Sequence, residues 1–339
     1  MKKGTEKKVS RVGLDIGTRL IKALEVSSEG STHRLIKFRF SEVAFPLTPE
    51  NTARAIRSLL EELNPSVKEV NISFSAPAAI VRFVNMPTMT QDDLRNSLRF
   101  EAEKYIPYNI NEVIIDASIL ENISETKQQM RVLLAAAKRD AVDSRLAMLK
   151  DIGYSVPLID IDSFACFNAF CNASENIDLS KSVVLINIGY TQVNVLISIG
   201  NIPYFTRDIQ ISGKDIARAI SKELQIEEKE ADKFIFDPKG KSAEVLEVAK
   251  PVLSNLVDEL RLSFGYYENQ YGKSINEIYI SGGVARMDGI LDYLEENLGI
   301  RPMPWNPFSK FEISPEIDTK SLEAVRAQFA VCAGLTIRR

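Results

Sequence analysis

Histidine and cysteine are both scarce in this chain of 339 residues, which contains one histidine and three cysteines. Cys166 and Cys171 lie on a short apolar stretch, and the single histidine, His33, is far from them in sequence. A zinc site needs several such ligands at close spacing. The composition therefore excludes a metal site built from cysteine and histidine, and it predicts core positions for the thiols.

An excess of positive charge and a long apolar run are missing as well. Lys and Arg total 42 against 46 Asp and Glu, so the net charge is -4 and we expect no nucleic-acid partner. No window approaches about 18 consecutive apolar residues, so we expect no direct membrane span. Residues 1–10 form a polar, basic tail without an apolar signal core. We therefore expect a cytoplasmic protein that reaches a membrane only through a partner.

A short signature occurs twice in the sequence, at Val12–Thr18 and again at Val184–Thr191. Its polar residues, Asp15 in the first copy and Asn187 in the second, are 172 positions apart, about half of the chain. In each copy an apolar strand ends in Asp or Asn, a glycine and a hydroxyl residue. Such a hairpin is tight enough to point backbone N–H groups at a phosphate. Two of them facing each other predict a nucleotide clamp.

The order of the predicted elements indicates an α/β protein with a duplicated, actin-like (ribonuclease H-like) fold. The first half is expected to contain strands at 11–16, 21–26, 33–40 and 70–75, with a helix from Pro49 before the last of them. The second half is expected to contain strands at 183–188, 192–199, 202–208 and 277–281, and helices at 214–224, 227–236, 243–270, 287–298 and 322–335. Each half thus begins with three strands followed by a helix.

A small inserted subdomain interrupts the first half. Its predicted order is strand, helix, strand, strand, at 80–85, 91–104, 113–120 and 130–137. The expected organisation is a flexible tail at 1–10, a first lobe at 11–76 and 138–180, the insert at 77–137, and a second lobe at 181–339. In the second lobe the helices from about 213 to 271 are expected to contact the nucleotide.

Three motifs together resemble those of the superfamily that contains actin, heat-shock chaperones and sugar kinases. Gly13–Thr18 and the second hairpin resemble its two phosphate motifs, and Ile280–Gly283 resembles its adenosine motif. The insert is more specific, because Arg82–Pro87 and Leu98–Pro107 resemble the PilM family, FtsA-like proteins of type IV pilus assembly. This resemblance extends over nearly the whole chain.

The PilM resemblance implies a clamp with ATP and Mg2+ in the central cleft. It also implies a groove between the insert and the first lobe that holds the N-terminal peptide of the membrane protein PilN. Through PilN the protein would be recruited to the cytoplasmic face of the inner membrane, where it would link PilN, and indirectly PilO, to the motor components. This is the role of a scaffold that binds nucleotide.

The superfamily resemblance assigns roles to the first hairpin. Asp15 is expected to hold Mg2+ through water, while Gly17 and Thr18 offer N–H groups and a hydroxyl to the phosphates. Lys22 matches a family lysine that can reach a phosphate, and Arg19 stands where the family usually has a small residue. A turn-capping role for Asp15 and a solvated surface position for Lys22 are the alternatives.

The other candidate nucleotide-binding residues come from the second half of the chain. Gly189 and Thr191 are expected to cradle phosphate, Gly282 and Gly283 to pass close under the adenosine, and Gly213, Lys214 and Asp232 to lie near the ribose and adenine. Asp232 replaces the usual Glu, one methylene longer, which weakens that expected contact.

Two departures lie in the second hairpin. Asn187 stands where these ATPases usually carry Asp, and Tyr190 stands where the residue is usually small. The first removes a charge that helps to bind hydrated Mg2+ and to orient water. We therefore expect weak or absent hydrolysis and assign no catalytic residue.

For the partner groove the candidates come from the insert. They are Ile80, Val81, Arg82, Phe83, Val84, Leu94, Leu98 and Tyr105. Most residues in such apolar stripes belong to a core, which is the alternative interpretation. A bound peptide would be expected to combine apolar anchors with main-chain pairing.

Other functions compete with the adaptor. A small-molecule kinase of the same fold would need a carboxylate base beside its acceptor, for which Asp160, Asp162 and Asp208 remain once Asn187 replaces the obvious one. FtsA usually continues into a membrane-binding helix and GspL into a transmembrane helix, and neither pattern is present in the 339 residues. Both adaptor alternatives are therefore less favoured.

Overall fold

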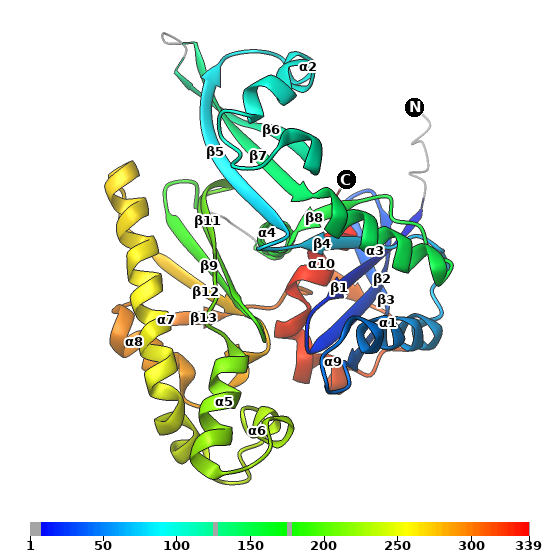
Figure 1. Cartoon of the computed structure of the whole chain (residues 1–339), viewed down its shortest axis with the longest axis vertical. Coiled ribbons are helices and arrows are strands. Elements are labelled where there is room, and N and C mark those ends of the chain that lie inside the picture. Colours follow the sequence, from blue (N-terminus) through cyan, green and yellow to red (C-terminus); the bar gives the residue numbers. More distant parts are fainter. Residues whose placement is uncertain (1–7, 125–127, 175–177, 339) are drawn as a thin grey trace.

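Each of the two lobes contains one main sheet (Figure 1). The computed structural model describes residues 8–124, 128–174 and 178–338. The first-lobe sheet consists of β1 (Val9–Ile16), β2 (Leu20–Glu29), β3 (Thr32–Glu42), β4 (Asn71–Phe74), β8 (Ile159–Ile161) and β14 (Phe311–Ile313). The second-lobe sheet consists of β9 (Ser182–Ile188), β10 (Val193–Ile199), β11 (Ile202–Ile209), β12 (Glu277–Ser281) and β13 (Pro302–Pro304).

The two sheets share one strand order. The first is ordered β14-β3-β2-β1-β4-β8 and the second β11-β10-β9-β12-β13. Apart from β14, each sheet therefore runs from its own third strand through the second and first to the fourth and fifth. In both, an antiparallel meander is followed by parallel strands. The repeated topology agrees with the duplication that the two signatures predict.

Helices cover the outer face of the first-lobe sheet. They are α1 (Pro49–Leu63) and α3 (Arg139–Asp151). Thr48 caps α1 by accepting a hydrogen bond from the Asn51 N–H, and Asn64 ends the helix in the left-handed region, with φ of 41°. Because α1 buries Ile56 and Leu59 against the sheet, its polar residues face solvent.

A central helical layer separates the two sheets. It contains α4 (Asp162–Ala173) and α10 (Ala330–Ile337), whose buried residues pack with Val183 and Leu185 of the second sheet. The helices cross at Gly334, where an added Cβ would lie 1.7 Å from the carbonyl oxygen of Ala165. Only glycine permits this approach. The same layer buries the thiols of Cys166 and Cys332, in agreement with the prediction of core positions, whereas Cys171 on α4 is only partly buried.

The outer face of the second sheet carries α5 (Gly213–Leu224), α6 (Glu228–Phe234), α7 (Ser242–Tyr271) and α8 (Ile290–Leu298). A 3-10 turn, η2 (Val284–Arg286), follows β12. The long helix α7 lies along the outside of this lobe, and α5 and α6 lie at its far end (Figure 1).

The insert forms a separate small core. It consists of β5 (Ala79–Pro87), α2 (Gln91–Ala102), η1 (Ile110–Glu112), β6 (Val113–Ser124) and β7 (Gln129–Lys138), with the strand order β5-β7-β6. Two polar contacts join it to the second lobe: the Tyr204 hydroxyl donates to Glu121 at 2.8 Å, and the Arg131 guanidinium lies 4.1 Å from the Tyr204 ring centroid.

The last part of the chain differs from the prediction. The helix expected at 322–335 is divided into α9 (Thr319–Val325), a 3-10 turn η3 (Arg326–Phe329) and α10. The carbonyl of Ala327 accepts a hydrogen bond from the Gly282 N–H at 2.9 Å. The turn η3 therefore binds the backbone directly after β12 of the second-lobe sheet. The helix expected from 287 begins at Ile290. Strands β13 and β14 were not predicted, and β14 returns the chain to the first sheet, inside the range assigned to the second lobe.

Candidate functional site

A cavity of about 860 Å³ lies between the two lobes, and we call it the cleft. Its volume is in the range of small-molecule sites. Except for Lys214 and Gly282, the residues predicted to bind nucleotide all line it. These are Asp15, Gly17, Thr18, Arg19, Lys22, Asn187, Gly189, Tyr190, Thr191, Gly213, Asp232 and Gly283.

The two hairpins meet across the cleft. The hydroxyl oxygens of Thr18 and Thr191 are 3.1 Å apart and share a hydrogen bond. The second hairpin is closed by the Gly189 N–H, which donates to the carbonyl of Gln192 at 2.9 Å. The turns that the signatures predict are therefore brought together by the fold.

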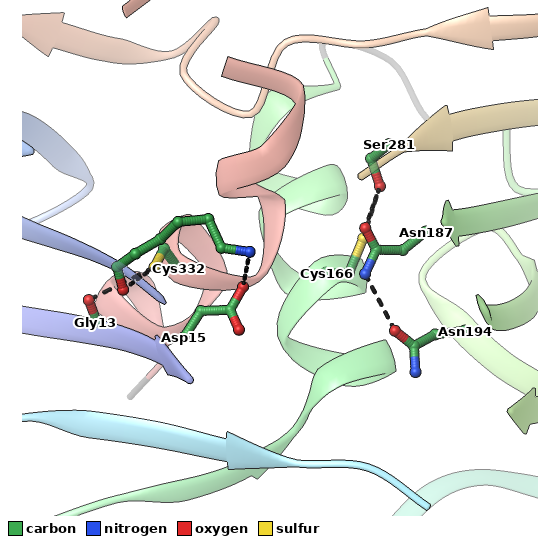
Figure 2. A network of polar contacts seen from close by, with 8 residues as sticks. Gly13, Asp15, Cys166, Asn187, Asn194, Ser281 and Cys332 are labelled. Atoms are coloured by element: carbon green, nitrogen blue, oxygen red, sulfur yellow. Dashed lines mark hydrogen bonds and ion pairs between the residues drawn. The ribbon is translucent and has the colours of Figure 1, made fainter. Parts of the chain in front are cut away.

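Asp15 and Lys22 form an ion pair in the cleft. The Lys22 ammonium nitrogen lies 2.6 Å from a carboxylate oxygen of Asp15, and Asp15 is labelled in Figure 2. Burial on its own lowers the pKa of Lys22, but the Asp15 charge raises it, and the net pKa is above the ordinary value. Lys22 is thus a largely buried lysine that pairs with a carboxylate, and the alternative of a solvated surface position is wrong. A contact between Lys22 and phosphate stays a prediction.

Asn187 belongs to a chain of polar contacts on the facing side of the cleft (Figure 2). Its amide donates to the Asn194 side-chain oxygen at 3.1 Å and accepts from the Ser281 hydroxyl at 3.3 Å. Asn194 in turn donates to Asp208 at 2.7 Å, and Asp208 accepts the backbone N–H of Ala76 at 2.8 Å. The network therefore runs from the second hairpin to the segment that enters the insert.

Arg19 joins the lobes at another point of the cleft. Its guanidinium donates to Asp232 at 2.6 Å and to Glu42 at 2.7 Å. Burial raises the pKa of Asp232, while Arg19 lowers it. In the described part of the chain, the second carboxylate oxygen of Asp232 and the hydroxyl of Tyr190 are buried without a hydrogen-bond partner. Buried polar atoms without partners are uncommon, and these two would be satisfied by a polar ligand.

The third motif has two roles. Gly282 adopts φ of 96°, and an added Cβ would lie 2.3 Å from the Ile188 carbonyl oxygen, so this glycine is required for packing beneath the hairpin. Gly283 lines the cleft, as does Arg286, whose guanidinium lies 5.8 Å from the ring centroid of Phe236. The backbone N–H of Lys214 donates to the Tyr190 carbonyl at 2.7 Å, and Lys214 is not among the residues that line the cleft.

The first lobe supplies two further residues. Asp162, at the start of α4, lines the cleft, and burial together with the Asp15 charge raises its pKa to about 6. Asp162 is one of the three carboxylates considered for a kinase. Arg145 on α3 also lines the cleft, and it was not predicted. No local sequence signal marks it, since only the packing of α3 after the insert brings it to the site.

A second cavity, of about 670 Å³, lies between the insert and the first lobe, and we call it the insert groove. Residues of the insert strands β6 and β7 line one side, and residues of β8 and α4 line the other. Asp160, which is 4% exposed, pairs with Arg338 in this lining. Phe74 and its neighbourhood separate the two cavities, because Phe74 lines both.

None of the residues predicted for the partner groove lines this cavity. Leu94 and Leu98 are 0% and 7% exposed and belong to the core of the insert. Ile80–Val84 lie on β5, and Tyr105 packs against the insert core. In the sheet order β5-β7-β6, the cavity is lined mainly by β6 and β7, and β5 contributes only Ala79 at its start. Whether a partner contacts the expected β5 and α2 residues stays a prediction.

The chain is similar to known proteins in both sequence and structure. A family model described as type IV pilus assembly protein PilM matches residues 13–339. A solved structure named as the PilM-PilN type IV pilus biogenesis complex is 27% identical in sequence and superposes with a TM-score of 0.86. The match covers 97% of this chain and 98% of that one.

More distant structures share the fold. Ethanolamine utilization protein EutJ from Carboxydothermus hydrogenoformans matches with a TM-score of 0.56 at 12% identity, covering 98% of this chain and 90% of EutJ. MreB5 of Spiroplasma citri bound to ADP gives 0.51 at 12% identity, covering 96% and 94%. These similarities confirm the predicted actin-like fold.

Proposed function

We propose, from the premise that this chain belongs to the type IV pilus assembly protein PilM family, that it is an ATP-binding adaptor that docks the N-terminal peptide of PilN. The observation that carries the proposal is the insert groove, on a chain whose fold matches the PilM-PilN complex over 97% of its length. The cleft would bind the nucleotide and the groove would bind the peptide.

The cleft has the features that a nucleotide requires. The facing hairpins place hydroxyl groups and glycine backbone beside each other, as phosphate binding needs. The unsatisfied buried atoms of Asp232 and Tyr190 suit the hydroxyls of a ribose. Burial raises the pKa of Tyr190 to about 12, so its hydroxyl keeps the proton at neutral pH and can donate it.

Asp15 and Asp162 are the carboxylates that would face a hydrated Mg2+ ion. Hydrated Mg2+ needs few protein ligands, so these two residues fit such an ion. When bound, Mg2+ would neutralise phosphate charge. Asp15 already accepts the Lys22 ammonium group, and Asn187 brings no charge from the other side. These residues favour binding of nucleotide over its hydrolysis, and we propose that hydrolysis is weak or absent.

The insert groove has the features that an extended peptide requires. Most of its lining is apolar, with alanines on β7 and phenylalanines on α4. Strands β6 and β8 are edge strands of their sheets, so unpaired backbone groups are available on both sides. A peptide can pair with such an edge while its alternate side chains enter pockets. The buried Asp160 and its partner Arg338 would fix the polar part of the peptide.

Recruitment to the membrane follows from this partner. No helix in the described ranges is both long and apolar enough to cross a bilayer. We propose that the chain is cytoplasmic and is held at the inner membrane by PilN. Indirect contact with PilO, and contact with the motor components, belong to the same proposal.

A small-molecule kinase is less well supported. Of its three candidate bases, Asp208 uses both carboxylate oxygens in hydrogen bonds, and Asp160 pairs with Arg338 at the insert groove. Of the three, Asp162 is the one that lines the cleft, and there burial raises the pKa of its carboxyl group while the side chains of Ser73 and Ser75 lower it.

The decisive experiment is calorimetric titration with a synthetic PilN N-terminal peptide, with and without Mg-ATP. A scrambled peptide of the same composition is the control. Saturable binding of the true peptide alone supports the adaptor. No binding in either condition contradicts it, and a coupled assay in which ATP turnover requires an added small molecule would favour the kinase.

A further inference from the structure

Arg145 is a cation of the cleft that the proposed contacts do not use. It extends from α3 into the cleft, and its guanidinium carbon lies 5.3 Å from the ring centroid of Phe74. Among the described residues, no hydrogen bond or ion pair holds this guanidinium. A partly buried arginine normally has carboxylate or carbonyl partners, because an enclosed charge is costly to leave unpaired.

The other cations of the cleft differ from Arg145. Lys22 is bound to Asp15, and Arg19 is bound to Asp232 and Glu42. Arg286 lies over a phenylalanine ring as Arg145 does, but Arg286 and the exposed Lys233 both belong to the second lobe, on the side of the adenosine motif. Within the described part of the chain, Arg145 is therefore the cleft cation on the first-lobe side that no hydrogen bond or ion pair holds, and phosphate rather than adenosine is expected on that side.

The charges around Arg145 show which end of the cleft it faces. Burial lowers its pKa, while Asp162 and Asp15 raise it, so both carboxylates lie within electrostatic reach. Asp15 is the penultimate residue of β1, the strand that leads into the first hairpin, and Asp162 is the first residue of α4. The phosphate that lies farthest from the adenosine would arrive at this end.

We propose that Arg145 binds the terminal phosphate of a nucleoside triphosphate and makes the cleft prefer triphosphate to diphosphate. This inference rests on the nucleotide binding proposed above. The planar guanidinium would donate two hydrogen bonds to one phosphate group, which the ammonium of a lysine cannot do with the same geometry. A diphosphate leaves Arg145 unpaired, so only the triphosphate relieves the cost of enclosing its charge.

The test is calorimetry with the full chain, in Mg2+, using ATP and ADP. Arg145→Gln should weaken ATP binding by roughly 10- to 100-fold, the range for a hydrogen bond to a charged group, and leave ADP binding within about twofold. Arg145→Lys should restore part of the preference for ATP. Arg57→Gln, at an exposed arginine on α1, is the matched control and should change neither affinity.

Unchanged ADP binding also shows that the Gln variant is folded. Equal losses for ATP and ADP, or no loss for either, would overturn the role of Arg145 while leaving the nucleotide site in place. If the wild-type chain binds neither nucleotide, the nucleotide part of the proposed function fails together with this inference. Peptide binding to the insert groove would be unaffected by that result.

Discussion

The hydroxyl oxygens of Thr18 and Thr191 lie 3.1 Å apart, although the residues are 173 positions apart in the chain. Each hydroxyl belongs to one of the two matching hairpins, and their hydrogen bond crosses the cleft between the lobes. The same groups would have to face the phosphates of a bound nucleotide. The pair therefore joins the two lobes at the point where the proposed phosphate site lies.

Thr191→Val should reduce ATP affinity by roughly fivefold and lower the free energy of unfolding by about 1 kcal/mol or less, because one hydroxyl is lost without a change of shape. Calorimetry and thermal unfolding measure the two effects. Thr206→Val is the control, since the Thr206 hydroxyl donates to the Val195 carbonyl at 3.0 Å inside the second sheet. An equal loss of ATP affinity in that control would contradict a specific role for Thr191.

Asn187→Asp should destabilise the protein by roughly 1–3 kcal/mol in EDTA, since the Asn194 side-chain oxygen would lose a donor and face a carboxylate. Added Mg2+ should restore part of this loss, because a new carboxylate attracts the hydrated ion. Thermal unfolding in EDTA and in Mg2+ measures both effects. The exposed Asn96→Asp variant should show neither, and equal stability of Asn187→Asp and wild type in EDTA would refute the predicted clash.

The raised pKa of Asp162, about 6, predicts how stability depends on pH. The folded-state pKa lies above the unfolded value of about 4. The protonated Asp162 carboxyl therefore makes its full contribution to the free energy of unfolding below pH 4, and this contribution is lost as the pH rises through 6. At neutral pH the ionised carboxylate then costs the folded state at most about 3 kcal/mol, and less if solvent in the cleft screens it.

Asp162→Asn should therefore be more stable than wild type at pH 7.5, and the difference should vanish near pH 4. Urea unfolding across this range measures the difference. The control is Asp143→Asn at an exposed position of α3, which should change the free energy of unfolding by an amount that does not vary with pH. Parallel curves for wild type and Asp162→Asn would show that the Asp162 carboxyl does not titrate as stated.

Ala135→Trp should abolish PilN peptide binding and leave ATP binding unchanged. Ala135 lines the insert groove, on the opposite face of β7 from the buried Leu134 and Ala136, so a large side chain would fill the groove without entering the insert core. Calorimetry with peptide and with ATP separates the two sites. The control is Ala147→Trp on the exposed side of α3. Full peptide affinity in Ala135→Trp would place the peptide elsewhere.

The hairpins of the cleft were predictable because their signal is local. Asp15, Gly17 and Thr18 follow an apolar strand, and the second copy repeats the pattern with Asn187 and Gly189. Such short motifs fix the turn by themselves. Their facing positions followed from the duplication, since two copies of one topology tend to place equivalent turns at a shared interface.

Features that depend on distant contacts were not predictable. The division of the helix expected at 322–335 serves a hydrogen bond between Gly282 and Ala327. The pairing of Lys22 with Asp15 depends on the burial of both side chains in the cleft, and the presence of Arg145 there depends on how α3 packs after the insert. The lining of the insert groove by β6 and β7 depends on the strand order, which the sequence does not reveal, and the partner residues expected on β5 stay a prediction.

Phe74 lines both the cleft and the insert groove. A ligand that moved Phe74 in one cavity would change the lining of the other. Such an influence is thermodynamically mutual, because whatever factor nucleotide applies to peptide affinity, peptide must apply to nucleotide affinity. A pilus machine that holds its peptide in the groove would thereby set how long nucleotide stays in the cleft.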